Sequence, residues 1–138
     1  MRRHLLSTVL ALLALTSTSA ASSVIYSALG RPTTVQTDTG VLIHASGWVF
    51  TCETGQQPQT GALFYIDGNG QWTPVAHGSI LWRQYRPDVR DAGKASCPNL
   101  GPYVGVGLTF PTYPGALWLV VVWDDGEFGS QVYYLPLW

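Results

Sequence analysis

Charged residues are scarce in this chain of 138 residues, where lysine, arginine, aspartate and glutamate together make up 11%. Four of the seven basic residues fall in or just before the stretch YRPDVRDAGKASC; they are Arg83, Arg86, Arg90 and Lys94. Nucleic-acid binding needs several phosphate contacts spread over a surface. A mildly acidic chain with one basic loop does not offer them, so we expect no nucleic-acid partner.

Long apolar runs are also lacking, apart from Leu5–Leu15 near the N-terminus, which follows Arg2 and Arg3. This run is shorter than the roughly 20 residues of a membrane helix. Small residues at positions 18–20 then fit a cleavage site, so residues 1–21 are predicted to be a secretory signal peptide. Residues 22–138 would then form one exported domain, extracellular or periplasmic, with no membrane span and a net charge of about −3.

Cysteine is limited to Cys52 and Cys97. In an oxidising compartment such a pair is expected to form a disulfide. Closing a loop of about 46 residues would stabilise the fold by roughly 4 kcal/mol on the chain-entropy model. No CxxC or HxxxH spacing occurs, and the pair Asp67 and Asn69 lacks the later ligands of a calcium loop. We therefore predict no metal site and no cofactor.

No segment has a helical hydrophobic period, and nine prolines and fifteen glycines further disfavour helices. Short β-type runs instead recur between turn signals, which predicts an all-β sandwich or barrel. Gly47 interrupts the longest run and indicates a bulge or close backbone contact. Asp67–Gly70 has the composition of a hairpin turn, and a short helical turn can follow Pro87. The expected strands are Val24–Ala28, Thr33–Thr37, Val41–Cys52, Ala62–Asp67, Val75–Trp82, Tyr103–Phe110, Leu117–Trp123 and Phe128–Leu135.

Five short motifs occur in a recognisable order: Gly47-Trp48, Tyr65–Gly68, Arg86–Val89, Pro114-Gly115 and the strand Leu117–Asp124. In these motifs the chain resembles the immunoglobulin-like domains of secreted and cell-surface bacterial proteins, over about residues 38 to 128. The resemblance implies an immunoglobulin-like antiparallel β-sandwich located outside the cell. It implies no catalytic residues, because the family is not known for any.

The charged loop has a structural and a functional interpretation. In the structural one, Pro87 fixes a turn, Asp88 caps the following amides, and Arg86 pairs with a carboxylate or binds carbonyls. In the functional one, arginines of this loop contact an anion or a glycan. The shared family motif favours structure for Arg86, Pro87 and Asp88, whereas Arg83 and Arg90 remain candidates for ligand contact.

Residue patterns typical of hydrolases are missing. No Gly-x-Ser-x-Gly elbow is present, and His44 and Ser46 lie within an expected strand. The acidic residues Asp124, Asp125 and Glu127 fit a solvated hairpin turn better than a pair of catalytic carboxylates. We therefore predict no catalytic residue, and a small secreted hydrolase is the weakest of the functional alternatives.

Apolar residues occupy both faces of several expected strands. The family register would direct Trp118, Val120 and Val122 inward and leave Trp123 and Tyr65 outward; a shift of one residue would swap the faces and leave both apolar. Because a sandwich sheet normally has a polar outer face, something should cover this one. The chain itself, through residues 22–32 or 133–138, a second copy, or a glycan stacking on the aromatic rings could do so.

These observations favour a non-enzymatic binding or structural module at or outside the cell envelope. Its partner would be a protein, a second copy or a glycan on the apolar sheet face. The main alternative is a small carbohydrate-binding module that uses exposed aromatic rings. The residues predicted to contact a ligand or partner are Tyr65, Trp72, Trp82, Arg83, Tyr85, Arg90 and Trp123.

Overall fold

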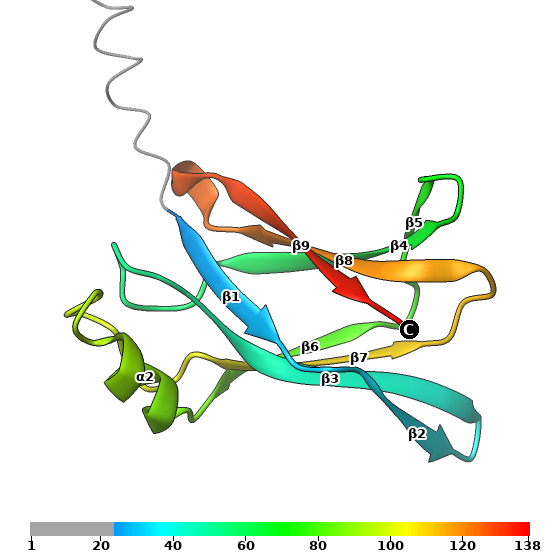
Figure 1. The fold of residues 1–138 in the computed structure, drawn as a ribbon, viewed down its shortest axis with the longest axis horizontal. Helices are drawn as coiled ribbons and strands as arrows, with labels where there is room; N and C mark the ends of the chain where they lie inside the picture. Colours follow the sequence, from blue (N-terminus) through cyan, green and yellow to red (C-terminus); the bar gives the residue numbers. More distant parts are fainter. Residues whose placement is uncertain (1–23) are drawn as a thin grey trace, which may run out of the picture.

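The computed structural model describes residues 24–138, in which two antiparallel β-sheets pack face to face (Figure 1). This architecture confirms the predicted all-β sandwich, while the predicted signal peptide, residues 1–21, lies outside the described residues. The first sheet has the order β1 (Ile25–Leu29), β3 (Gly40–Thr51), β7 (Gly105–Pro111) and β6 (Ser79–Gln84), and β2 (Thr33–Thr37) also pairs with β3. The second has the order β5 (Trp72–Pro74), β4 (Thr60–Asp67), β8 (Ala116–Asp124) and β9 (Ser130–Pro136).

Most expected strands are found within two or three residues of their predicted bounds. The exception is the segment around residues 72–84, where the structure has the short strand β5, a turn, and then β6. The short helix expected after Pro87 is α2 (Pro87–Gly93), which begins with that proline, and a 3-10 turn, η1 (Gly126–Phe128), precedes β9. The expected hairpin turn is also present, because the Asp67 Oδ1 atom accepts bonds from the amides of Asn69 and Gln71.

Gly47 permits the close backbone contact that its position in the sequence indicated. A Cβ atom at this position would lie 1.9 Å from the carbonyl oxygen of Ala28 on the neighbouring strand β1. No side chain can be accommodated at that distance. The glycine in the middle of β3 therefore lets β1 lie directly against it.

The predicted facing of β8 is wrong by one residue. Trp123 is 1% exposed and lies in the core with Leu119 and Val121, whereas Trp118 is 40% exposed on the outer face. The same correction applies to β4, where Tyr65 is buried rather than outward. Because β8 is apolar at every position from 117 to 123, alternation in the sequence could not set its register.

Strand β1 ties the two sheets together along one side of the sandwich (Figure 1). The amide of Ile25 donates to the Gln131 side chain, and the amide of Leu29 donates to the Tyr133 hydroxyl at 3.1 Å. On the other side, β5 pairs only with Phe64–Ile66 of β4, so the first half of β4 has no strand beside it there. The sandwich is therefore closed along β1 and open between β4 and β6.

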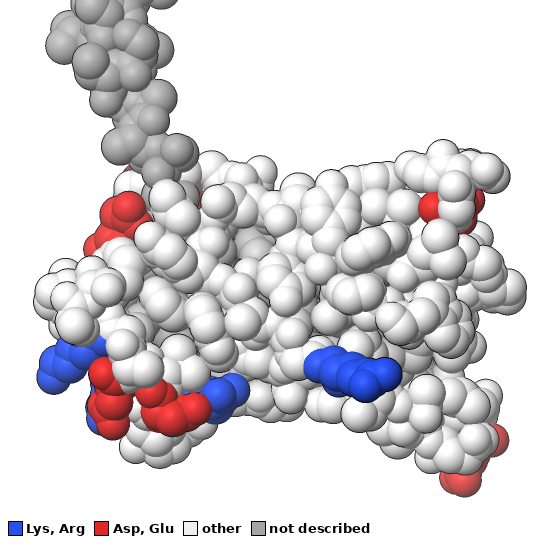
Figure 2. Space-filling model, in the orientation of Figure 1, with Lys and Arg blue, Asp and Glu red and all other residues white. Residues whose placement is uncertain are grey.

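A second, smaller core lies beneath α2 at one end of the sandwich. It consists of Phe50, Val89, Cys97, Leu100 and Val104, with Trp48 and Cys52 packed against it. Figure 2 shows charged side chains around α2 and at the other loop ends, with a largely uncharged surface between them. The face drawn in Figure 2 is therefore largely uncharged, with one basic side chain between its charged ends.

Candidate functional site

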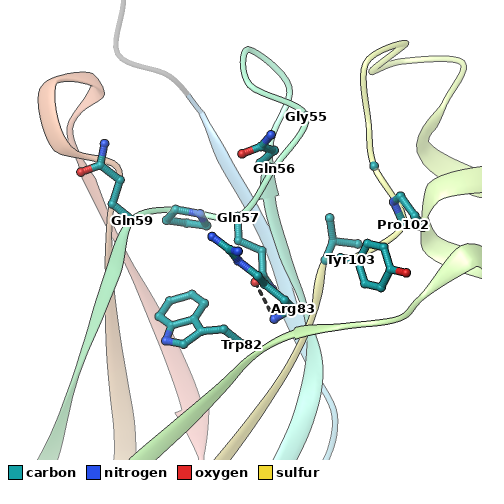
Figure 3. Close-up of a pocket in the computed structure, with 11 residues that line it drawn as sticks. Gly55, Gln56, Gln57, Gln59, Trp82, Arg83, Pro102 and Tyr103 are labelled. Atoms are coloured by element: carbon teal, nitrogen blue, oxygen red, sulfur yellow. Dashed lines mark hydrogen bonds between the residues drawn. The ribbon is translucent and has the colours of Figure 1, made fainter.

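A pocket of about 660 Å³ opens at the end of the sandwich that carries α2 (Figure 3). Three segments far apart in the sequence form its walls: the loop after β3, the end of β6, and the segment before β7. Its volume is within the range of small-molecule sites. The lining residues are Gly55, Gln56, Gln57, Pro58, Gln59, Trp82, Arg83, Gly101, Pro102, Tyr103 and Val104.

The disulfide predicted from the sequence holds two of these segments together. Cys52 and Cys97 are bonded, with their Cα atoms 5.0 Å apart. Nearby, the Gly101 amide donates to the Gly55 carbonyl at 2.9 Å. Gly55 has a φ of +66°, and a Cβ atom there would lie 2.0 Å from the carbonyl oxygen of Asn99. The bridge and the two glycines thus fix the loop after β3 against the segment before β7.

Gln57 connects the third wall to the other two. Its Nε2 atom donates to the Gly105 carbonyl at 2.8 Å, and its Oε1 atom accepts from the Arg83 amide at 2.8 Å (Figure 3). Both hydrogen-bonding groups of the side chain are therefore used within the protein. One amide side chain holds β6, β7 and the loop after β3 in a fixed arrangement.

Arg83 has an unusual backbone conformation for a strand residue. Its φ is +57°, and the pairing of β6 with β7 shifts register between Leu81 and Gln84. A bulge of this kind re-aims a side chain. A non-glycine residue in the left-handed region costs roughly 1–3 kcal/mol, and such strain is concentrated at binding and active sites. Here the bulge brings the Arg83 side chain into the pocket, where Figure 3 shows it extending toward the loop of residues 55–59.

Two aromatic side chains lie on opposite sides of Arg83 in Figure 3. Trp82 is half-buried and packs edge to face on Trp123 with 5.7 Å between ring centroids, so the core fixes its position. Tyr103 is 58% exposed and lies 5.4 Å from Tyr85, centroid to centroid. The pocket therefore offers one rigid and one exposed aromatic ring beside a guanidinium group.

The pocket continues toward the open side of the sandwich. A second cavity of about 380 Å³, between the first half of β4 and β6, shares Gln59 and Trp82 with the first. Leu63, Val75 and Ile80 give it an apolar lining. The two cavities together can accommodate an elongated ligand that passes over Trp82.

The residues predicted to contact a ligand are divided among four places. Trp82 and Arg83 line the pocket, and Tyr85 stands at its margin beside Tyr103. Trp72 lies 5.5 Å from Phe64 on the outer face of the second sheet. Arg90 forms an ion pair with Asp91 at 3.1 Å on α2. Tyr65 and Trp123 are core residues and are withdrawn as contact candidates.

The motif Arg86–Asp88 has the structural contacts expected of it, with one correction. Arg86 binds Asp88 through Nε and Nη2 at 2.9 and 2.8 Å, and its amide donates to the Pro102 carbonyl at 2.7 Å. The guanidinium group lowers the pKa of Asp88 to about 2. Arg86 is itself the N-cap residue of α2 and has no side-chain cap bond. The correction is that Arg86, not Asp88, occupies the N-cap position; Asp88 lies in the first turn of α2 and pairs chiefly with Arg86.

The outer face of the second sheet is apolar, as expected from a sequence in which both faces were apolar. Trp118 and Tyr134 meet edge to face at 6.4 Å, and Val132 is exposed beside them. The described chain does not cover these residues: β1 lies against the first sheet, and Trp138 is bonded through its Nε1 atom to the Ala116 carbonyl. The first of the three covers considered from the sequence, the chain itself, is therefore not provided by residues 24–32 or by the C-terminal tail.

Sequence reasoning missed the three glutamines of the pocket. Gln56, Gln57 and Gln59 lie in the run GQQPQ, directly after the Cys52 turn. A polar loop that follows a disulfide cysteine is a signal that could have been read. The position of this loop beside Trp82 and Arg83 could not be predicted, because that position depends on the packing of both sheets.

No family model, curated protein or solved structure matches this chain. The function of the pocket must therefore be inferred from its own geometry and chemistry.

Proposed function

We propose that this protein is an exported, non-enzymatic binding module with an immunoglobulin-like fold, and that it binds its ligand in the pocket around Arg83. The backbone of Arg83 carries this proposal. A strained φ of +57° is maintained by the Gln57 bond, and it brings an arginine into a concave site. Strain of this kind persists only where the surrounding structure holds it, and it is typical of ligand sites.

The chemistry of the pocket favours binding over catalysis. None of its eleven lining residues carries a carboxylate, an imidazole or a thiol. Hydrolysis by general acid–base catalysis or by a thiol nucleophile needs groups of these types in contact with substrate. Amide, guanidinium, indole and phenol groups instead supply hydrogen bonds and flat apolar surface, which suit recognition.

The strand order supports the immunoglobulin-like part of the proposal. If β1, β3, β4, β5, β6, β7, β8 and β9 are taken as strands A, B, C, C′, D, E, F and G, the first sheet has the order A-B-E-D. The second sheet has the order C′-C-F-G. Immunoglobulin domains divide their strands between the sheets in this way. The disulfide differs from theirs, because it joins the end of β3 to the loop after α2.

Two observations bear on export. Cys52 and Cys97 form a disulfide, and such bonds persist mainly in oxidising compartments. Among the described residues, no helix has the length and apolar character needed to cross a membrane. The signal peptide predicted for residues 1–21 provides the route of export in this proposal.

A fragment screen followed by NMR tests the binding site without assuming a ligand class. Small fragments should produce amide shifts concentrated at residues 55–59, 82–83 and 101–104. Tyr103→Ala should reduce those shifts, because the variant loses a ring that lines the pocket. The ring is exposed, so its loss leaves the core intact. Trp118→Ala, on the outer face, is the matched aromatic control and should leave them unchanged. Fragments that gather around Trp118 instead would contradict the proposal.

The outer face of the second sheet supports a second candidate function, association through an apolar surface. Trp72, Trp118, Val132 and Tyr134 are all substantially exposed there. A contiguous apolar patch of this kind is typical of interaction sites. Light scattering of the wild type and of Trp118→Ala would separate the two candidates, because only a dimer formed through this face is lost in the variant.

A further inference from the structure

Arg83 is the only charged residue among those that line the pocket. Its guanidinium group makes no hydrogen bond or ion pair with any other residue of the described chain, 24–138. Arg86 and Arg90, in contrast, are paired with Asp88 and Asp91. Of the arginines at this end of the sandwich, Arg83, Arg86 and Arg90, the one held in a strained conformation is thus the one whose guanidinium fork remains available for an external anion. Arg31 is also unpaired in the described chain, but it does not line this pocket.

A guanidinium group binds carboxylates, sulfates and phosphates through two parallel hydrogen bonds. In Figure 3 Arg83 lies between Trp82 and Tyr103, and its guanidinium group extends toward the loop of residues 55–59. An indole or phenol face suits the apolar C–H face of a sugar ring. The ligand that satisfies both groups therefore carries an anionic substituent next to a flat, partly apolar ring.

Two glutamine side chains add hydrogen-bonding capacity at the rim. Gln56 and Gln59 are exposed, and their side-chain amides make no hydrogen bond with other residues of the described chain. Each amide offers two N–H donors and a carbonyl acceptor. Such groups match the vicinal hydroxyls of a sugar, which both donate and accept. Gln57 is unavailable for this role because both of its groups are already bonded.

We propose that the pocket binds an acidic oligosaccharide, whose carboxylate or sulfate pairs with Arg83 while an adjacent ring stacks on Trp82 or Tyr103. The second cavity, which shares Gln59 and Trp82, accommodates the next sugar of the chain. This inference rests on the proposed function of the pocket and adds the ligand class to it.

Calorimetric and NMR titrations with four probes test the inference. The probes are an oligogalacturonate, a sulfated oligosaccharide, a neutral oligosaccharide of the same length, and sodium acetate as an anion without a sugar. One or both acidic sugars should bind about tenfold or more tightly than the neutral one, and acetate should bind far more weakly. Comparison of the two acidic probes identifies the anionic group. Affinity for the acidic sugar should fall as salt is raised.

Three variants assign the effect to Arg83. Arg83→Asn removes the guanidinium group but tolerates the left-handed backbone, and it should reduce acidic-sugar affinity to that of the neutral sugar. Arg83→Lys keeps the charge without the fork and should lie between the two. Arg90→Asn, on α2 outside the pocket lining, is the matched control and should leave affinity unchanged. Urea unfolding of each variant checks that the fold is retained.

The outcomes distinguish failure of the acidic-sugar inference from failure of the proposed binding function of the pocket. Equal affinity for acidic and neutral sugars, or an unaltered Arg83→Asn, overturns the acidic ligand while pocket binding stands. If no sugar binds but fragments still occupy the pocket, the sugar class is wrong and the binding site survives. Acidic-sugar shifts confined to residues outside the pocket overturn both.

Discussion

Two tryptophans of β8 face opposite sides of the second sheet, and truncation of each should have very different consequences. Trp123 is 1% exposed, packs on Trp82 at 5.7 Å and lies against Gly61. Removing a fully buried tryptophan side chain costs about 3–5 kcal/mol, from lost burial and the cavity left behind. Trp118 is 40% exposed and has one edge-to-face neighbour, Tyr134, so Trp118→Ala should cost roughly 1–2 kcal/mol.

The measurement is urea unfolding of wild type, Trp118→Ala and Trp123→Ala followed by far-UV circular dichroism. The midpoint should fall at least twice as far for Trp123→Ala, with similar m-values for the three proteins. Trp123→Phe should cost less than Trp123→Ala, because it retains a ring and removes an indole N–H that has no hydrogen-bond partner among the described residues. A larger loss for Trp118→Ala would show that β8 has the opposite facing and would refute this register.

Three further predictions concern the elements that hold the pocket. The double variant Cys52→Ser with Cys97→Ser should lose roughly 4 kcal/mol of unfolding free energy, since 45 residues separate the bridged cysteines; an unchanged urea midpoint would contradict this. Gln57→Ala should cost about 2 kcal/mol for two lost hydrogen bonds, whereas Gln59→Ala should be nearly neutral, and equal midpoints for the two would contradict the bridging role. Burial, with Glu53 and Asp124 nearby, raises the pKa of Asp125. Its charged form therefore destabilises the fold above that pKa, so Asp125→Asn should be more stable than wild type at pH 7, with the difference shrinking as the pH falls toward 4. A difference that grows on acidification would contradict that sign.

Much of the architecture could be predicted from the sequence because turn chemistry marks it clearly. Asp67–Gly70 and the glycine in β3 were interpreted correctly, since each depends on local backbone requirements. The disulfide could be predicted from the cysteine count and the predicted compartment alone. The strand β5 was missed because it is three residues long and ends in Pro74, so it has too few residues to show alternation.

Which face of each strand points into the core could not be predicted from the sequence, for a physical reason. In β8 every residue from Leu117 to Trp123 is apolar, so the period-2 signal that normally separates core from surface is absent. Facing is then decided by which large side chains fit between the sheets, and Trp123 fits against Trp82 and the small residue Gly61. Packing of this kind is a property of both sheets together.

The pocket was only half predictable. Trp82 and Arg83 stood out as an aromatic and a basic residue near a charged loop, and both line it. Their relation to Gln57 depends on a bulge with a left-handed arginine, a conformation that glycine or asparagine would be expected to occupy. The sequence therefore gave no reason to expect the strained conformation from which the function is inferred.

The most direct test of the central claim is the NMR signal of the Arg83 Nε–H group during titration with an acidic oligosaccharide. The proposed site predicts that this signal shifts and saturates with the same dissociation constant as the amides of residues 56–59 and 101–104. It also predicts that the Nε–H signals of Arg86 and Arg90 stay in place, because both groups remain paired with aspartates. An Arg83 signal that does not move while the sugar binds elsewhere would contradict the account.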